Sequence, residues 1–138
     1  MTEPKVGASA TVDLVVREAD CASALKLSND PRDNFPSVFA TTRMIALMEL
    51  AGARLLHPLL QPGEMSVGAH VDVSHIAATP IGAKVTASAT YRGRDGKLFV
   101  FDVIAHDPAG EIGRGTHKRA IISEDRLLTG AAKRRGEE

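Results

Sequence analysis

The stretch FATTRMIALMELAGARLLH, residues 39–57, has the composition of a buried helix. Two threonines stand near its start, and almost every later position is apolar. The Pro and Gly of QPGE, residues 61–64, favour a stop after it. We therefore predict a helix over residues 42–60, with Thr41 or Thr42 as its N-cap.

Segments with strand character lie on both sides of this helix. TVDLVVRE (11–18) precedes it, and four more follow, joined by short turns such as RDG and DPAG: SVGAHVDVSHIA (66–77), AKVTASATYRG (83–93), KLFVFDVIAH (97–106) and EIGRGTHKRAII (111–122). Consecutive strands joined by such short turns are antiparallel. The chain therefore predicts an α+β fold, one long central helix wrapped by a curved antiparallel sheet of about five strands.

The length of 138 residues predicts a single domain. Residues 19–36 include the turn-rich SNDPRDNFP, and they are long enough to form a lid. The chain from Ser123 onward looks frayed or disordered, so residues 1–6 and 124–138 are predicted to be flexible.

Charge and cysteine content exclude several classes of protein. Seventeen acidic and seventeen basic residues give no net charge, so neither nucleic acid nor an anionic membrane is an expected partner. No apolar run is long enough to span a bilayer, and the N-terminus lacks the apolar core of a signal peptide. Cys21 is the single cysteine, which excludes a disulfide within the chain and suits a reducing cytoplasm. We expect a cytoplasmic protein.

Glu49 is the unusual residue of the predicted helix. No positive charge lies three or four positions away, so no local ion pair explains it. A carboxylate on a buried helix needs a partner, a proton or an open cleft. It is either a partly exposed residue at the helix rim or a functional group, and the small neighbours Ala46, Gly52 and Ala53 leave room beside it.

His75 is a second candidate, because its strand parity places it with Val71 and Val73. Such a histidine is either a packed core residue or a functional one. His70 has the opposite parity, which argues against a shared metal site. The sequence has no glycine-rich phosphate loop and no metal-ligand spacing, so we expect neither a metal nor another cofactor.

Three blocks of the chain, FPSVFATTRMIALMELA, SVGAHVDVSHIAATP and EIGRGTHKRAII, together resemble the fluoroacetyl-CoA thioesterase family. This family is a branch of the hotdog-fold acyl-CoA thioesterases, and the resemblance extends over residues 6–123. It implies a hotdog fold, a homodimer and an acyl-CoA substrate. It also implies two sets of site residues: catalytic Thr41, Glu49 and His75, and substrate-binding Phe35, Gly68 and Arg119.

The resemblance implies hydrolysis of a small acyl-CoA to the acid and coenzyme A. Glu49 is then the general base or the nucleophile, Thr41 positions Glu49 or the carbonyl, His75 manages protons, and the Gly68 amide holds the carbonyl oxygen. The alternatives are an acyl-CoA-binding hotdog protein without turnover and a hotdog hydratase or dehydratase. The chain departs from the family pattern at Thr42, where a glycine is usual, and in the lid, where Phe35 is the only aromatic residue.

Overall fold

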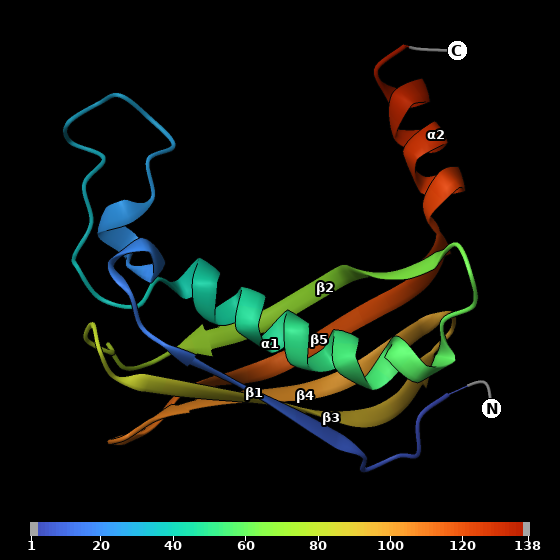
Figure 1. Ribbon diagram of the computed structural model, residues 1–138, viewed down its shortest axis with the longest axis horizontal. Helices are drawn as coiled ribbons and strands as arrows, with labels where there is room; N and C mark the ends of the chain where they lie inside the picture. Colours follow the sequence, from blue (N-terminus) through green and yellow to red (C-terminus); the bar gives the residue numbers. More distant parts are fainter. Residues whose placement is uncertain (1–2, 137–138) are drawn as a thin grey trace.

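In the computed structural model, which describes residues 3–136, one antiparallel sheet curls around one long helix (Figure 1). The strands are β1 (Ser9–Val15), β2 (Glu64–His75), β3 (Lys84–Asp95), β4 (Leu98–Asp107) and β5 (Gly110–Ser123), and the helices are α1 (Thr41–Leu56) and α2 (Glu124–Arg134). The strand order is β1-β3-β4-β5-β2, and every neighbouring pair is antiparallel. The predicted α+β hotdog architecture is confirmed.

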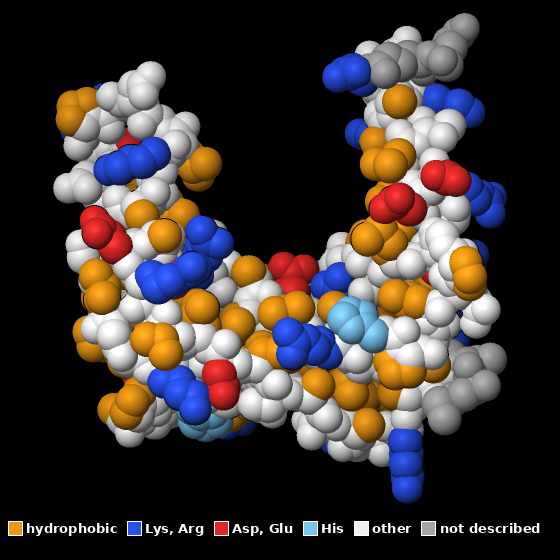
Figure 2. Space-filling model, in the orientation of Figure 1, with side chains coloured by type: hydrophobic (Ala, Val, Ile, Leu, Met, Phe, Trp, Pro, Cys, Tyr) orange, Lys and Arg blue, Asp and Glu red, His pale blue; other side chains and the backbone are white. Residues whose placement is uncertain are grey.

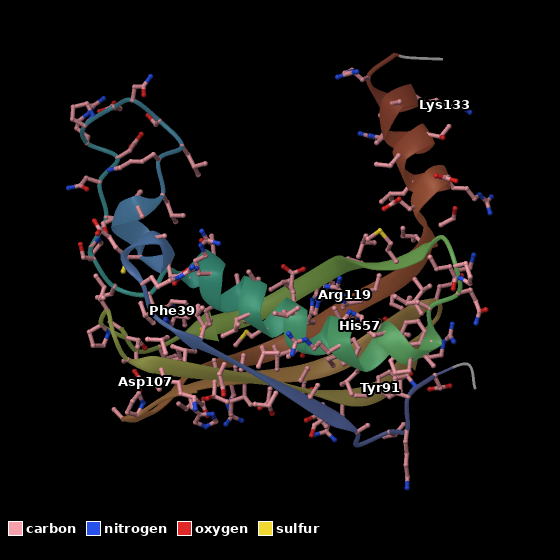
Figure 3. The ribbon with its side chains drawn as sticks, viewed as in Figure 1. Phe39, His57, Tyr91, Asp107, Arg119 and Lys133 are labelled. Atoms are coloured by element: carbon pink, nitrogen blue, oxygen red, sulfur yellow. The ribbon has the colours of Figure 1, made fainter. Side chains whose placement is uncertain are left out.

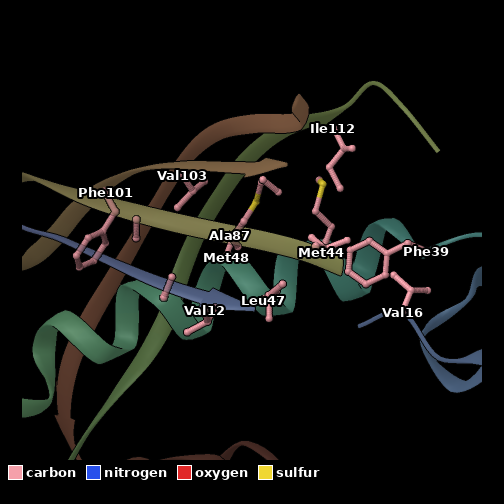
Figure 4. Close-up of a cluster of buried hydrophobic side chains, with 14 of the residues drawn as sticks. Val12, Val16, Phe39, Met44, Leu47, Met48, Ala87, Phe101, Val103 and Ile112 are labelled. Carbon is pink, nitrogen blue, oxygen red and sulfur yellow. The ribbon is translucent and has the colours of Figure 1, made fainter. Parts of the chain in front are cut away.

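The core lies between α1 and the concave face of the sheet (Figure 4). Met44 and Met48 of α1 are fully buried there, and each such side chain stabilises the fold by about 1.5–3 kcal/mol. On β3, Ala87 and Ala89 face them, and their small side chains let the helix lie close to the sheet. Phe101 of β4 fills the space nearer the C-terminal end of the helix.

The start of α1 differs from the prediction. Its N-cap is Ala40, which has no side-chain oxygen, so the assignment of Thr41 or Thr42 as the cap is wrong. Both threonines lie in the first turn of the helix. The hydroxyl of Thr41 is engaged by His75 of β2 and is therefore not used for capping.

The end of α1 also comes earlier than predicted. The helix stops at Leu56, and a short 3-10 helix (His57–Leu59) follows. Pro58 lies in this turn. Proline has no amide hydrogen to continue the α-helical hydrogen bonds, and this explains the early stop.

The prediction of a frayed segment after Ser123 is wrong for residues 124–134, which form α2. The Ser123 hydroxyl accepts a hydrogen bond from the amide of Arg126 at 3.3 Å and so caps the helix. Acidic residues occupy the first turn and basic residues the last, an arrangement that the helix dipole favours. The flexibility predicted for residues 1–2 and 137–138 concerns positions outside the described residues.

The predicted lid rises from the sheet beside the start of α1 (Figure 1). It contains two 3-10 turns (Glu18–Asp20 and Ala22–Ala24) and then an open loop. Three backbone hydrogen bonds join its two legs at the base: the amide of Ala22 donates to Val38, that of Ser23 to Pro36 and that of Ala40 to Asp20. The base is therefore tied together, whereas the tip carries Leu27 with 96% of its surface exposed.

The close approach of β2 and β5 at Gly115 generates a stability prediction. A Cβ at this position would overlap the carbonyl oxygen of Asp72 and lie 2.6 Å from the Cα of Val73. Since backbone atoms cannot swing aside as a flexible side chain can, Gly115→Ala should lower the free energy of unfolding by roughly 1–3 kcal/mol.

The matched control is Gly130→Ala in α2, because nothing lies within 4 Å of that added Cβ. This control should raise the free energy of unfolding by up to about 1 kcal/mol. Urea unfolding followed by circular dichroism, at one protein concentration, measures both variants. A Gly115→Ala protein as stable as the wild type would contradict the close approach.

Candidate active site

A carboxylate, that of Glu49, lies midway along α1 on the side that faces β2 and β5. Its Oε2 is 3.5 Å from Nη1 of Arg119 and 3.9 Å from Nε2 of His117, both on β5. The β2 backbone at Gly68 is so close that a Cβ there would overlap this oxygen. The Glu49 side chain is still 36% exposed, so a substrate can reach it. Glu49 has no positively charged partner within its own helix, and β5 supplies one in Arg119.

Arg119 provides a fixed positive charge beside this carboxylate. Its Nε donates to the hydroxyl of Ser66 and its Nη2 to the Ser66 carbonyl, both at 3.0 Å. Burial lowers the pKa of Arg119 and the charge of Glu49 opposes that effect, but an arginine remains protonated at neutral pH. Figure 3 shows Arg119 between the middle of α1 and β2.

Thr41 and His75 form a second group at the start of α1. The Thr41 hydroxyl lies 2.7 Å from Nδ1 of His75. Among residues 3–136, Nε2 of His75 is the only buried side-chain polar atom without a hydrogen-bond partner. Burial lowers the pKa of His75, and the nearby backbone of Ala77 opposes this without forming a well-aligned hydrogen bond. A neutral imidazole with one free nitrogen can receive or deliver a proton.

These two groups are apart within one chain. Thr41 and Glu49 are eight residues apart, which corresponds to about 12 Å along the helix axis. The expectation that Thr41 positions Glu49 is therefore not met inside a single protomer. Figure 2 shows a wide hollow above α1, between the lid and α2.

The six predicted site residues thus divide into three places. The structure gathers Glu49, Gly68 and Arg119 in one group, pairs Thr41 with His75, and leaves Phe35 on the lid. Phe35 is 52% exposed and lines a lid pocket together with Leu25 and Leu27.

The cluster around the Glu49 carboxylate contains two further residues, His117 and Ser66, that the sequence did not predict. His117 was not singled out, because the sequence shows no metal-ligand spacing and no other pattern was considered for it. A usable signal existed, since residues 117 and 119 are two apart on a strand and so share a face. Ser66 carried no such signal, because it meets Arg119 only through the pairing of β2 with β5.

The arrangement suits attack on an electrophilic carbon. A carboxylate can attack directly or through water, and the hydroxyl–imidazole pair can manage the proton of a leaving group. Within the described part of the chain, no group of three or more His, Cys, Asp or Glu residues could hold a metal ion. No helix between residues 3 and 136 has the length and apolar character needed to cross a membrane.

Comparison with known proteins agrees with this chemistry. Residues 16–125 match the sequence model of a family described as fluoroacetyl-CoA-specific thioesterases. The fluoroacetyl-CoA thioesterase of Streptantibioticus cattleyicolor is 43% identical over 118 residues, which cover 86% of this chain and 85% of that protein.

Two solved structures are similar over nearly the whole chain. A mutant of the fluoroacetyl-CoA-specific thioesterase FlK, in complex with fluoroacetate and CoA, has a TM-score of 0.83 and 41% identity, covering 89% of this chain and 98% of that one. A thioesterase superfamily member from Thermus thermophilus has a TM-score of 0.82 and 26% identity, covering 98% and 97%.

Proposed function

Because the chain belongs to the fluoroacetyl-CoA-specific thioesterase family, it is an acyl-CoA thioester hydrolase, and we propose that Glu49, Thr41 and His75 hydrolyse a small acyl-CoA. The observation that carries this assignment of residues is the Glu49 carboxylate. It stands 3.5 Å from Arg119 and against the backbone of Gly68, on a helix that is otherwise apolar on its buried faces.

The reaction converts a thioester and water into a carboxylic acid and a thiol. Glu49 either attacks the acyl carbon, forming an anhydride that water hydrolyses after the thiolate leaves, or removes a proton from the water that attacks the acyl carbon. The Gly68 amide donates to the carbonyl oxygen as negative charge develops there. His75, oriented by the Thr41 hydroxyl, passes a proton to the departing thiolate and regains one from the water consumed in the reaction, so that it ends neutral.

The first prediction for this mechanism is a loss of turnover in Glu49→Gln. The amide keeps the size of the side chain but can act neither as base nor as nucleophile, so kcat should fall by roughly 10²–10⁴-fold. Release of free thiol from acetyl-CoA, detected with a chromogenic disulfide, measures it. Glu124→Gln, which removes an exposed carboxylate from α2, is the matched control.

Turnover of Glu49→Gln near the wild-type rate would contradict a chemical role for Glu49. Saturable acyl-CoA binding by the wild type without thiol release would favour a binding protein. Formation of an alkene from a 3-hydroxyacyl-CoA, or addition of water to that alkene, would favour the hydratase or dehydratase alternative.

We also propose that the enzyme is a homodimer paired through β2. This strand is at the edge of the sheet and is twelve residues long, so one side of its backbone is unpaired. Its apolar residues Met65 and Val71 are 48% and 39% exposed. A long apolar edge is a template for pairing with another chain, and a two-fold axis joins a strand to its own copy.

Such a dimer would bring the two groups of the site together. Thr41 contacts His75, and Glu49 contacts Gly68, so the two pairs lie at opposite ends of the same stretch of α1 and β2. Antiparallel pairing of β2 with its copy near Val71 would place Thr41 and His75 of one protomer opposite Glu49 and Gly68 of the other. Each active site would then draw on both chains.

Subunit complementation tests this arrangement. Thr41→Ala and Glu49→Gln should each be inactive alone, but a mixed dimer would contain one site with both native residues. An equal mixture, co-expressed so that chains pair at random, should therefore recover about a quarter of the wild-type activity. A mixture that stays inactive would place Thr41 and Glu49 of one chain in the same site, and a monomeric mass in solution would contradict the dimer.

We further propose one catalytic domain over residues 1–138 that acts in the cytoplasm, since Cys21 is buried and free, as is usual in a reducing compartment.

The lid suggests a broad choice of acyl group. Besides Phe35, its pocket offers only Leu25 and Leu27 as apolar side chains. Each methylene-sized apolar contact contributes only about 1–3 kcal/mol to discrimination between substrates.

We predict activity on several small acyl-CoAs, with kcat/KM for fluoroacetyl-CoA exceeding that for acetyl-CoA by only about 10–200-fold. Thiol release from fluoroacetyl-, acetyl-, propionyl- and phenylacetyl-CoA measures the preference, and Phe35→Ala should reduce it further. A preference above about 10⁴ would show that selectivity does not depend on the lid's apolar groups.

A further inference from the structure

A buried histidine that the mechanism above does not use, His117, lies directly behind the carboxylate. It is only 1% exposed, and its ring stacks on Phe101 with the centroids 6.4 Å apart. Glycines lie on two sides of it. A Cβ added at Gly52 would come within 3.5 Å of its Cδ2, and one added at Gly68 within 3.3 Å of its Cε1. The imidazole therefore occupies a fitted slot between α1, β2 and β5.

The hydrogen bonds of this ring determine its tautomer. Nδ1 lies 2.8 Å from the carbonyl oxygen of His70, and a carbonyl can only accept, so Nδ1 carries the hydrogen. Nε2 lies 3.1 Å from Nη1 of Arg119, and a guanidinium can only donate, so Nε2 presents its lone pair. Burial lowers the pKa of His117, and the charge of Arg119 acts in the same direction, while the His70 carbonyl and Glu49 oppose them.

This neutral imidazole completes the hydrogen bonding of Arg119. Ser66 takes Nε and Nη2 of the guanidinium, and His117 takes Nη1, the nitrogen that faces Glu49. The acceptors at Ser66 and His117 are uncharged. These three contacts fix the Arg119 guanidinium without neutralising its positive charge, so the charge can still act on the Glu49 carboxylate.

The geometry points to His117 as a positioning residue, which holds the Arg119 guanidinium against Glu49 and thereby sets the direction of the carboxylate toward the substrate. This inference rests on the proposed function, because it assigns His117 a part in the same hydrolysis. His117 acts through Arg119, because its Nε2 lies 3.9 Å from Oε2 of Glu49, beyond hydrogen-bonding distance.

Two substitutions separate this role from simple core packing. In His117→Gln the amide oxygen can reach the place of Nε2 and accept from Arg119, whereas the shorter His117→Asn ends near the place of Nδ1 and leaves Arg119 without its acceptor. His117→Asn should lower kcat by roughly 10–100-fold with little change in KM, as expected for a misplaced reacting group. His117→Gln should retain most of the wild-type kcat.

A double-substitution cycle shows whether the effect passes through Arg119. In an Arg119→Ala background, His117→Asn should cause no further loss of kcat, because groups that act as a unit are not additive. Equal losses in His117→Gln and His117→Asn, or a full effect of His117→Asn without Arg119, would overturn the inference. The wild-type rate in the same assay tests the proposed function separately, since the inference depends only on the ratios between variants.

A spectroscopic measurement serves if the variants fold poorly. Nitrogen-15 NMR spectra of the His117 imidazole in the wild-type protein at neutral pH should show one tautomer, protonated at Nδ1 and free at Nε2. A protonated Nε2, or a mixture of tautomers, would overturn the inference without any activity measurement.

Discussion

The packing of α1 into the curl of the sheet is the constraint from which the rest of this molecule follows. A helix with apolar side chains over most of its circumference must be covered on more than one side. A flat sheet would cover a single stripe, whereas the curved sheet reaches around to Met44 and Met48 and brings Ala87 and Ala89 close to the helix axis. The flank of α1 that faces β5 and the edge strand β2 is the place where polar groups can face both the core and the solvent.

The cluster of residues around the Glu49 carboxylate occupies that flank. The exposure of each member reflects a balance between burial in the core and access to solvent. Arg119 is nearly buried, yet each of its three side-chain nitrogens reaches an acceptor, so its charge is tolerated there. Glu49 stays partly exposed. Gly68 makes the arrangement possible, because a Cβ there would overlap the Glu49 carboxylate and press on the imidazole, whereas a Cβ at Gly52 would make only ordinary contact with the ring.

Local patterns in the sequence predicted the elements well, because helices and hairpins are specified by neighbours in the chain. The turns RDG and DPAG correctly separated the strands, and the apolar run of α1 correctly identified the central helix. Pairings between distant segments were out of reach. Glu49 meets a guanidinium 70 positions away, and no rule based on helix spacing could locate it. Glu49 stood out from the helix pattern alone, whereas its neighbours Gly68 and Arg119 were named in advance only through the family resemblance. Residues 124–134 were expected to be flexible, yet they form α2. A serine caps this helix, and its charges follow the order that the helix dipole favours.

The tied base of the lid has a consequence for how such an enzyme can change over generations. Its legs meet at Ala40, the residue immediately before Thr41, and the amide of Ala40 is fixed to Asp20. Asp20 is fixed in turn by Arg17. Beyond these hydrogen bonds, the tip of the lid contributes little to the core. It can therefore accept insertions or new side chains at small cost in stability. Under the proposed function, mutational drift in the tip could therefore explore new acyl groups while the Thr41 hydroxyl keeps its place beside His75.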